Sequence, residues 1–213
     1  MNFNIKEKRV YQIMKLDKYF DGWHNDLVPA HVDIFPWHGA AGDYHPVTKA
    51  RIAVCEDSLM VFMETSETGT RAEETDFSRQ VHTDSCMEFF LMPDPENSAQ
   101  YINWEFNPAR AVCLCIGTHR YDRHEIRLEN YREYFQVKTI THNDGWSLEY
   151  CIPLAFLRSC FPALELKKGH VMRGNFYKCG DKTARPHFGC WSPIDLPKPD
   201  FQCPGFFGDL IIN

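Results

Sequence analysis

The sequence predicts an all-β domain of the sandwich or barrel kind, and three observations favour this fold class. Short apolar segments recur along the chain, and turn signals separate them at intervals of about a dozen residues. Aromatic residues, which fill sandwich cores well, make up 14% of the 213 residues. Because no repeat, low-complexity tract or linker divides the chain, we expect one domain over residues 1–213.

The predicted strands end at clear turn signals. The first two form a hairpin, Ala50–Cys55 and Leu59–Glu64, around the polar turn Asp57-Ser58. The segment 65–83 is a predicted surface loop, and 119–134 is either a helix or an excursion between strands. Pro153 opens one short predicted helix, because proline is favoured at the first helical position. The other predicted strands are Met87–Leu91, Tyr101–Asn107, Val112–Ile116, Phe135–Ile140, Trp146–Ile152, Val171–Lys178 and Phe206–Ile212.

Polar side chains on alternating strand positions are candidates for a binding site. In the strand 101–107, apolar residues occupy one face, and polar residues occupy the other. Amides, carboxylates and guanidinium groups can bind adjacent hydroxyls of a ligand. The alternative is that these residues form an ordinary solvated outer face. The candidates are Asn103, Glu105 and Asn107 on one strand, Arg173 and Asn175 on another, and Glu88 on a third.

Charge and hydropathy argue against several function classes. The net charge is −6, from 23 Lys and Arg against 29 Asp and Glu, and no dense basic patch occurs. Nucleic-acid and anionic-membrane surfaces need such a patch, so neither partner is expected. The first nine residues carry charges before any apolar stretch, and no run approaches the roughly twenty apolar residues of a membrane span. We therefore expect a cytoplasmic protein, although secretion of a longer precursor stays open.

The nine cysteines cannot all be paired in disulfides, because their number is odd. A reducing compartment fits this composition best, and an anaerobic exterior is the alternative. Cys86, Cys151 and Cys190 lie in apolar or strand-like segments, where a thiol acts as a small hydrophobe. Cys113 and Cys115 form a C-x-C pair on one face of a strand. Because no C-x-x-C pair exists, zinc binding is the less favoured interpretation.

A series of short motifs gives the chain a family resemblance. From about Asp21 to Ile212, their order resembles the family 9 carbohydrate-binding modules, a broad group related to xylanase-associated modules. No single motif is decisive, but the ordered set is specific. The motifs are Phe20-Asp21-Gly22-Trp23, Lys49-Ala50-Arg51-Ile52, Asp84-Ser85-Cys86-Met87-Glu88, Tyr101-Ile102-Asn103-Trp104-Glu105, Gly145-Trp146-Ser147-Leu148-Glu149, Arg173-Gly174-Asn175-Phe176-Tyr177, Trp191-Ser192-Pro193 and Phe206-Phe207-Gly208.

The resemblance implies an antiparallel β-sandwich, jelly-roll or immunoglobulin-like, that binds a mono- or oligosaccharide without catalysis. It also implies a link to the breakdown of plant-type polysaccharides such as xylan or cellulose. The family places a binding aromatic residue just before the strand that begins near Asp84. No Trp stands there in this chain, so Phe77 and His82 are the candidates to replace it.

The resemblance also implies structural calcium, for which Asp43, Glu64 and Asp84 are candidate ligands because calcium prefers oxygen. No contiguous calcium loop is present. Trp191, at the start of a Pro-rich loop, is a candidate stacking platform for a sugar, and the alternative is a lid over the core. The other tryptophans are predicted core residues, namely Trp23, Trp37, Trp104 and Trp146.

Two other functions stay open from the sequence. Glu88 and Glu105 could act as the acid and base of a glycoside hydrolase, although no catalytic motif accompanies them. The ten His and seven Met leave room for a small-molecule or redox-cofactor binder, since His and Met are axial ligands. No cofactor is predicted, and the oligomeric state is not predicted either.

Overall fold

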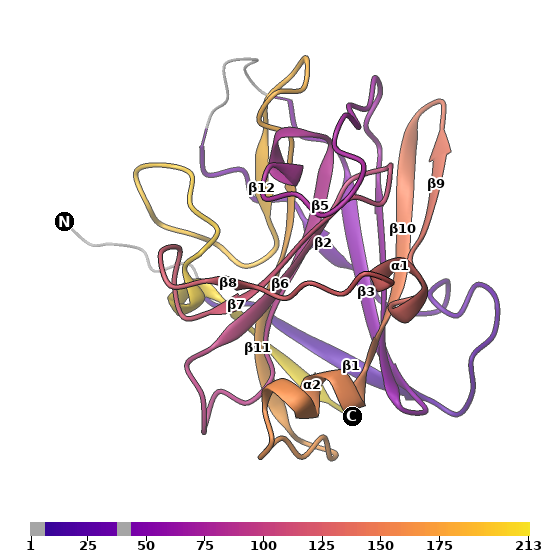
Figure 1. Cartoon of the computed structure of the whole chain (residues 1–213), viewed down its shortest axis with the longest axis vertical. Coiled ribbons are helices and arrows are strands. Elements are labelled where there is room, and N and C mark those ends of the chain that lie inside the picture. Colours follow the sequence, from indigo (N-terminus) through magenta and orange to yellow (C-terminus); the bar gives the residue numbers. More distant parts are fainter. Residues whose placement is uncertain (1–6, 38–43) are drawn as a thin grey trace.

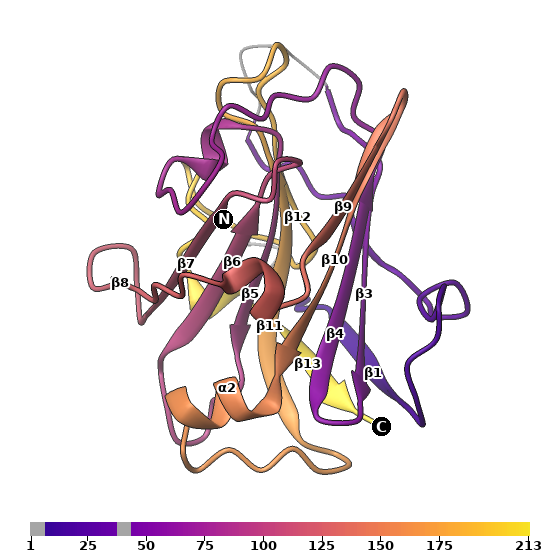
Figure 2. The ribbon, with the colours of Figure 1, turned by 45° about the vertical axis from the view of Figure 1, so that its right-hand side comes forward.

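Thirteen strands form one hydrogen-bonded sheet in the described part of the chain, and the sheet curls until its two halves face each other (Figures 1 and 2). The computed structural model describes residues 7–37 and 44–213. The path through the sheet runs β8-β7-β6-β5-β11-β13-β1-β3-β4-β10-β9, with β12 beside β11 and β2 beside β3. The all-β prediction is thus confirmed, and the sandwich takes the form of a continuous curled sheet.

The first half, here called the β11 half, contains seven strands. They are β5 (Cys86–Met92), β6 (Tyr101–Phe106), β7 (Val112–Gly117), β8 (His124–Glu125), β11 (Val171–Cys179), β12 (Phe188–Cys190) and β13 (Gly208–Ile212). The second half, the β4 half, contains five. They are β2 (Ala30–Val32), β3 (Thr48–Cys55), β4 (Ser58–Thr65), β9 (Lys138–His142) and β10 (Gly145–Pro153).

Strand β1 (Val10–Leu16) joins the two halves. Its first part, Val10–Ile13, pairs with β13, and its last part, Met14–Leu16, pairs with β3. Both pairings are parallel, whereas the other strand ladders of the described residues are antiparallel. The antiparallel expectation therefore fails at β1, because this strand enters the sheet between two strands that run in its own direction.

The core lies between the inner faces of the two halves. Phe89, Trp104 and Phe176 of the β11 half meet apolar residues of β3, β4 and β10, such as Val61 and Leu148. The Phe89 ring stacks at 4.8 Å from Phe176 and 6.2 Å from Trp104, measured between ring centroids. Burying each such side chain stabilises the fold by about 1.5–3 kcal/mol. The four tryptophans predicted in the core are all buried.

The outer face of the β11 half is buried as well, which the sequence did not predict. The Pro-rich segment 193–207 lies beside this half of the sheet (Figure 1). Its residues Phe201 and Phe207 pack against Phe90, Tyr101 and Tyr177. The alternative interpretation, an ordinary solvated outer face, is therefore wrong for Glu88, Asn103, Glu105, Asn107 and Asn175, which are buried. It holds for Arg173, whose side chain is 46% exposed.

Two short α-helices complete the fold, and the one that follows Pro153 was predicted. α2 (Leu154–Cys160) begins directly after Pro153. The undecided segment 119–134 contains both β8 and α1 (Tyr131–Tyr134), so each alternative holds for part of it. Two 3-10 turns occur at η1 (Val81–Thr83) and η2 (Pro204–Phe206). No helix in residues 7–37 and 44–213 is both long and apolar enough to cross a membrane.

Some element boundaries differ from the prediction. The turn between β3 and β4 is Glu56-Asp57, with Glu56 at a φ of 50°, and Ser58 already belongs to β4. β9 begins at Lys138 instead of Phe135, whose ring turns into the core. The strands β1, β2, β8 and β12 were not predicted.

Candidate ligand-binding site

A cavity of about 190 Å³ lies on the outer face of the β11 half. Side chains of β5, β6, β7 and β11 form its floor, namely Glu88, Glu105, Cys113 and Cys179. Its rim comes from loops that lie far apart in sequence. The rim residues are Arg79, His82, Arg120, Arg123, Asp181, Phe188, Pro199, Asp200, Phe201 and Gln202.

Strand register brings the floor residues together. Glu88 of β5 lies opposite Glu105 of β6, and Glu105 lies opposite Cys113 of β7. Two residues before Glu88 on β5, Cys86 lies opposite Cys179 of β11. Side chains opposite each other on one face are close neighbours, with Cβ atoms about 4.5–5.5 Å apart. The pleat therefore places two carboxyl groups side by side, with thiols next to them.

The two carboxyl groups are buried and have few compensating partners. Glu105 Oε1 accepts a hydrogen bond from Asn103 Nδ2 at 3.0 Å and lies 3.5 Å from the Arg123 guanidinium. Glu88 Oε1 accepts one from the Cys179 thiol at 3.0 Å. Burial raises the pKa of both groups, and Glu105 raises that of Glu88 further. The floor can therefore present a protonated carboxyl group as a donor beside an acceptor.

Three arginines surround these acids, and each has a carboxylate partner. Arg123 also donates to Asn103 Oδ1 at 3.1 Å. Arg79 pairs with Glu125 at 2.7 Å, and Arg120 pairs with Asp200 at 2.8 Å. Cavity charges of both signs are thus balanced locally. Such a lining suits an uncharged ligand with many hydroxyls, which needs both donors and acceptors.

Aromatic rings supply the apolar part of the lining. Phe201 stacks on Tyr177 with ring centroids 4.1 Å apart, and half-buried Phe188 comes from β12. Of the two candidates to replace the missing Trp, His82 lines the cavity and lies 3.9 Å from Asp181. Phe77 is not in the lining, because its ring packs against Tyr131.

The predicted site residues divide into cavity residues and supporting residues. Glu88 and Glu105 line the cavity, and Asn103 lies beneath them. Asn107 binds Asp84 and the Ala111 amide, and Asn175 binds the backbone of Ser192. The side chains of Asn107 and Asn175 hold loops onto the sheet and are fully buried, and they do not line the cavity.

The remaining two predicted residues lie elsewhere. The Arg173 side chain is 46% exposed, pairs with Asp209 at 3.6 Å and does not line the cavity. Trp191 is only 3% exposed, and its ring meets Tyr11 and Phe176 edge-on in the core. The expected stacking platform is therefore corrected to the alternative, a core side chain, because Trp191 faces inward from the end of β12.

The two calcium candidates within the described residues each have other partners. The Asp84 carboxylate binds Arg71, the Glu74 amide and Asn107, which occupy both of its oxygens. Glu64 pairs with Arg51 at 2.9 Å on the β4 half. The third candidate, Asp43, lies outside the described residues. Asp84 and Glu64 thus give no support to a calcium site.

Sequence reasoning missed most of the rim. Arg79, Arg120, Arg123, Phe188 and Phe201 lie on loops or a three-residue strand, and no motif or periodicity marks them. The strand alternation found Glu88 and Glu105, because a regular pleat fixes the face of each side chain.

Comparisons with known proteins decide the family. A family model described as carbohydrate-binding family 9 matches residues 20–212. The chain belongs to carbohydrate-binding family 9. A crystal structure from Bacteroides uniformis, provisionally described as a carbohydrate-binding protein, is 28% identical, with a TM-score of 0.79 over 97% of this chain and 100% of that one. A search of the curated proteins finds no match.

Two complexes of a family 9 module from Caldicellulosiruptor kristjanssonii share the fold. The glucose complex is 15% identical, with a TM-score of 0.65 over 96% of each chain. The cellotriose complex is 14% identical, with a TM-score of 0.65 over 96% of this chain and 93% of that one. β1 precedes the residues that the family model matches, so that match rests on the other strands.

Proposed function

We propose that the cavity of this family 9 domain binds one sugar ring, either a monosaccharide or the end of an oligosaccharide, without catalysis. The observation that carries the proposal is the side-by-side pair Glu88 and Glu105 on the floor, with Arg123 beside it. Carboxyl and guanidinium groups bind adjacent hydroxyls in bidentate fashion. Phe188 and Phe201 offer apolar surface to the C–H face of a pyranose ring.

The size of the cavity favours a small ligand. Its volume of about 190 Å³ is below the roughly 300–1,000 Å³ of typical pockets for drug-sized ligands. The solved family 9 complexes contain glucose and cellotriose. We therefore propose a glucose-type or xylose-type ring as ligand, taken from plant-type polysaccharide fragments.

The hydrolase alternative is disfavoured by the placement of the two acids. An acid and a nucleophile or base must flank the glycosidic bond. Glu88 and Glu105 are instead cross-strand neighbours on one wall of the cavity. That placement suits contacts with two hydroxyls on the same side of a ring.

Calorimetric titration with glucose, xylose, cellotriose and xylotriose tests the proposal. We expect saturable binding to wild type and an at least tenfold loss of affinity in Glu105→Gln and in Phe188→Ala. The first change alters a carboxyl group that binds ligand hydroxyls beside Arg123, and the second removes the ring surface offered to the C–H face of the pyranose. Arg173→Ala, outside the cavity, is the control and keeps wild-type affinity. Absence of binding to every sugar, or turnover of an aryl glycoside that Glu88→Gln abolishes, would contradict it.

A further inference from the structure

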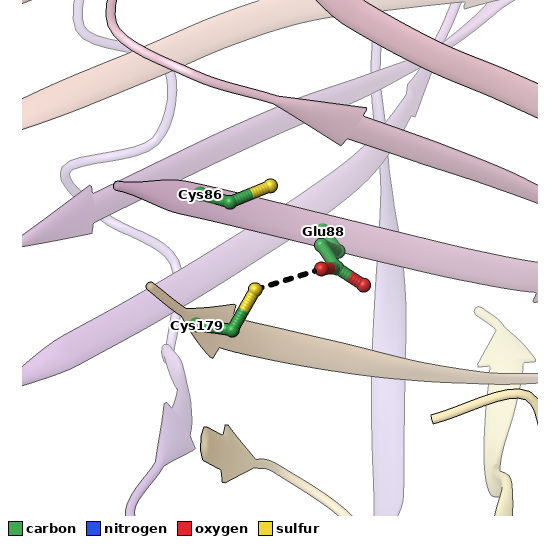
Figure 3. Close-up of side chains that lie close together, drawn as sticks. All are labelled: Cys86, Glu88 and Cys179. Carbon is green, nitrogen blue, oxygen red and sulfur yellow. Dashed lines mark hydrogen bonds between the residues drawn. The ribbon is translucent and has the colours of Figure 1, made fainter. Parts of the chain in front are cut away.

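Two thiols without a role in the proposed sugar site converge with Glu88, which that site also uses, at the cavity floor. Cys86 begins β5, Cys179 ends β11, and Glu88 follows Cys86 by two positions on the same face of β5 (Figure 3). Their sulfur and oxygen atoms all lie within 4.8 Å of one another. In residues 7–37 and 44–213, this is the single group of three or more His, Cys, Asp and Glu side chains with such convergence.

We propose that Cys86, Cys179 and Glu88 form a binding site for a thiophilic divalent cation, with Zn²⁺ as the natural candidate. Thiolate sulfur selects zinc and other soft cations over calcium or magnesium. Zinc binds sulfur at about 2.3 Å and carboxylate oxygen at about 2.0–2.2 Å in tetrahedral geometry. Ligand atoms already this close reach those distances by side-chain rotation alone, without a shift of the strands.

The backbone makes this arrangement rigid. Cys86 and Cys179 are direct cross-strand partners within an antiparallel ladder that spans seven residue pairs. All three side chains are buried, and the Cys179 thiol already donates to Glu88 Oε1 at 3.0 Å. A metal ion would replace this thiol proton and join the same two atoms. Preorganisation of that kind reduces the ordering cost of binding.

Three protein ligands leave one position of a tetrahedral site open. Cys179 and Glu88 line the cavity, whereas Cys86 lies behind them. The fourth position therefore faces the cavity, where water or a ligand hydroxyl could fill it. An open position of this kind is typical of three-ligand zinc sites.

The surroundings tolerate the charge of the loaded site. Two thiolates and one carboxylate around a divalent cation carry a net charge of −1, and Arg79, Arg120 and Arg123 line the same cavity. Because the thiolate and not the thiol is the metal ligand, binding of the cation releases the thiol protons.

The residue spacing explains why the sequence does not reveal this site. Zinc motifs bring paired cysteines from one loop, as in C-x-x-C. Here Cys86 and Cys179 are more than ninety positions apart in the sequence, and the register of the sheet brings them together. The nearby C-x-C pair, Cys113 and Cys115, has its sulfurs 3.8 Å apart but has no carboxylate between them.

Cobalt titration of the reduced, metal-free chain under argon tests the proposal. Thiolate ligation of Co²⁺ gives near-ultraviolet charge transfer, and tetrahedral Co²⁺ gives strong visible bands. We expect both signals to saturate at one equivalent of Co²⁺ and to disappear when Zn²⁺ is added. Absence of thiolate bands at stoichiometric Co²⁺ would overturn the proposal.

Four single variants locate the site. Cys86→Ser and Cys179→Ser should lose the thiolate bands and weaken Co²⁺ binding by more than the roughly 10–100-fold typical of outer-shell changes. Cys113→Ser, in the same cavity, and Cys151→Ser, on β10, are matched controls that keep the bands. Bands lost in Cys113→Ser and kept in Cys86→Ser would overturn the assignment.

A measurement on wild type guards against misfolded variants. Alkylation in urea just below the unfolding transition, where local opening makes buried thiols reactive, should show by peptide mapping that Zn²⁺ protects Cys86 and Cys179 and leaves Cys151 unprotected. Equal labelling of all three thiols with and without Zn²⁺ would contradict the site. These readouts are independent of sugar binding, because Cys86 does not line the cavity and the sugar titrations can be performed without metal.

Discussion

Lys178 is a charged side chain with no exposure to solvent, and its neighbours explain how the fold tolerates it. Its ammonium lies 2.9 Å from Glu67 Oε2 and 2.9 Å from His187 Nε2, and it donates to the Cys179 carbonyl. Glu67 also accepts hydrogen bonds from Ser85 and Trp146. Burial alone would raise the pKa of Glu67, but the ammonium outweighs it and lowers that pKa. The cluster links β11 to β10 across the core.

Lys178→Met should destabilise the fold by about 3–5 kcal/mol, because it leaves the Glu67 carboxylate buried and uncompensated. The double variant Lys178→Met/Glu67→Gln should recover most of that loss, since neither charge remains. Urea unfolding measures both values. Lys198→Met, at an exposed position, is the control and should stay within about 0.5 kcal/mol of wild type. Equal losses in the single and double variants would show that the charge pair is not the cause.

Individual site residues were predictable only where a regular strand carried them. Alternation in β5 and β6 placed Glu88 and Glu105 on one face, and the structure brings them together. The same alternation gave no information on what covers that face. Asn107 and Asn175 therefore prove to be buried loop anchors. Trp191 failed as a platform because its orientation depends on β12, which is too short to show a period.

At the level of elements, β1 is the part of the sheet on which the two halves depend. It pairs with β13 of the β11 half on one side and with β3 of the β4 half on the other. The hydrogen bonds of β1 therefore join the two halves into one sheet. Ile13 is fully buried, whereas Val10 is 56% exposed. The inward residues Tyr11 and Ile13 fill the core at the point where the halves meet.

Ile13→Ala should lower the free energy of unfolding by about 2–5 kcal/mol, because it removes buried methyl groups and leaves a cavity. Val10→Ala, on the exposed face of the same strand, should change it by less than about 0.5 kcal/mol. Chemical unfolding monitored by tryptophan fluorescence gives both values. A cost for Ile13→Ala no larger than that for Val10→Ala would show that β1 contributes little to joining the halves.

Predictability of the elements followed strand length and regularity. β3 to β7, β10 and β11 show clear apolar stretches or alternation and were predicted within a few residues. β1 was missed because exposed Val10 and Met14 are apolar and mask the alternation of Tyr11 and Ile13. β8 and β12 are only two and three residues long, so no period could develop. The covering role of segment 193–207 depends on long-range packing that local patterns do not contain.

For the whole molecule, buried titratable groups make stability depend on pH in two opposite ways. Burial, with a further effect from Lys178, lowers the pKa of His187 to about 4. The unfolded chain, with a His pKa near 6.5, then binds a proton that the folded chain does not, so stability falls as pH falls from about 6.5 to 4. Glu88 and Glu105 have raised pKa values, and their contribution to stability is instead lost as pH rises above about 4.3.

A comparison of His187→Gln with wild type isolates the histidine effect. Between pH 6.5 and 4, the wild-type free energy of unfolding should contain a contribution from His187 that falls by up to about 1.4 kcal/mol per pH unit. The variant should lack that contribution, so its curve should be flatter or reversed in this window. His142→Gln, at an exposed position, should follow wild type. Parallel curves for wild type and His187→Gln would contradict the effect.

The position of β1 also determines when the sheet can be completed. Val10 pairs with Asp209, so one side of β1 waits for a strand that is synthesised almost two hundred residues later. Until then, the hairpin β3–β4 and the pairs β5–β6 and β6–β7 can form from local contacts, while β1 keeps an unpaired edge. Sheets joined by such distant contacts have high contact order and fold slowly. We therefore expect closure of this sheet to come late in its assembly, and an incomplete chain to carry an open edge of the kind that promotes aggregation.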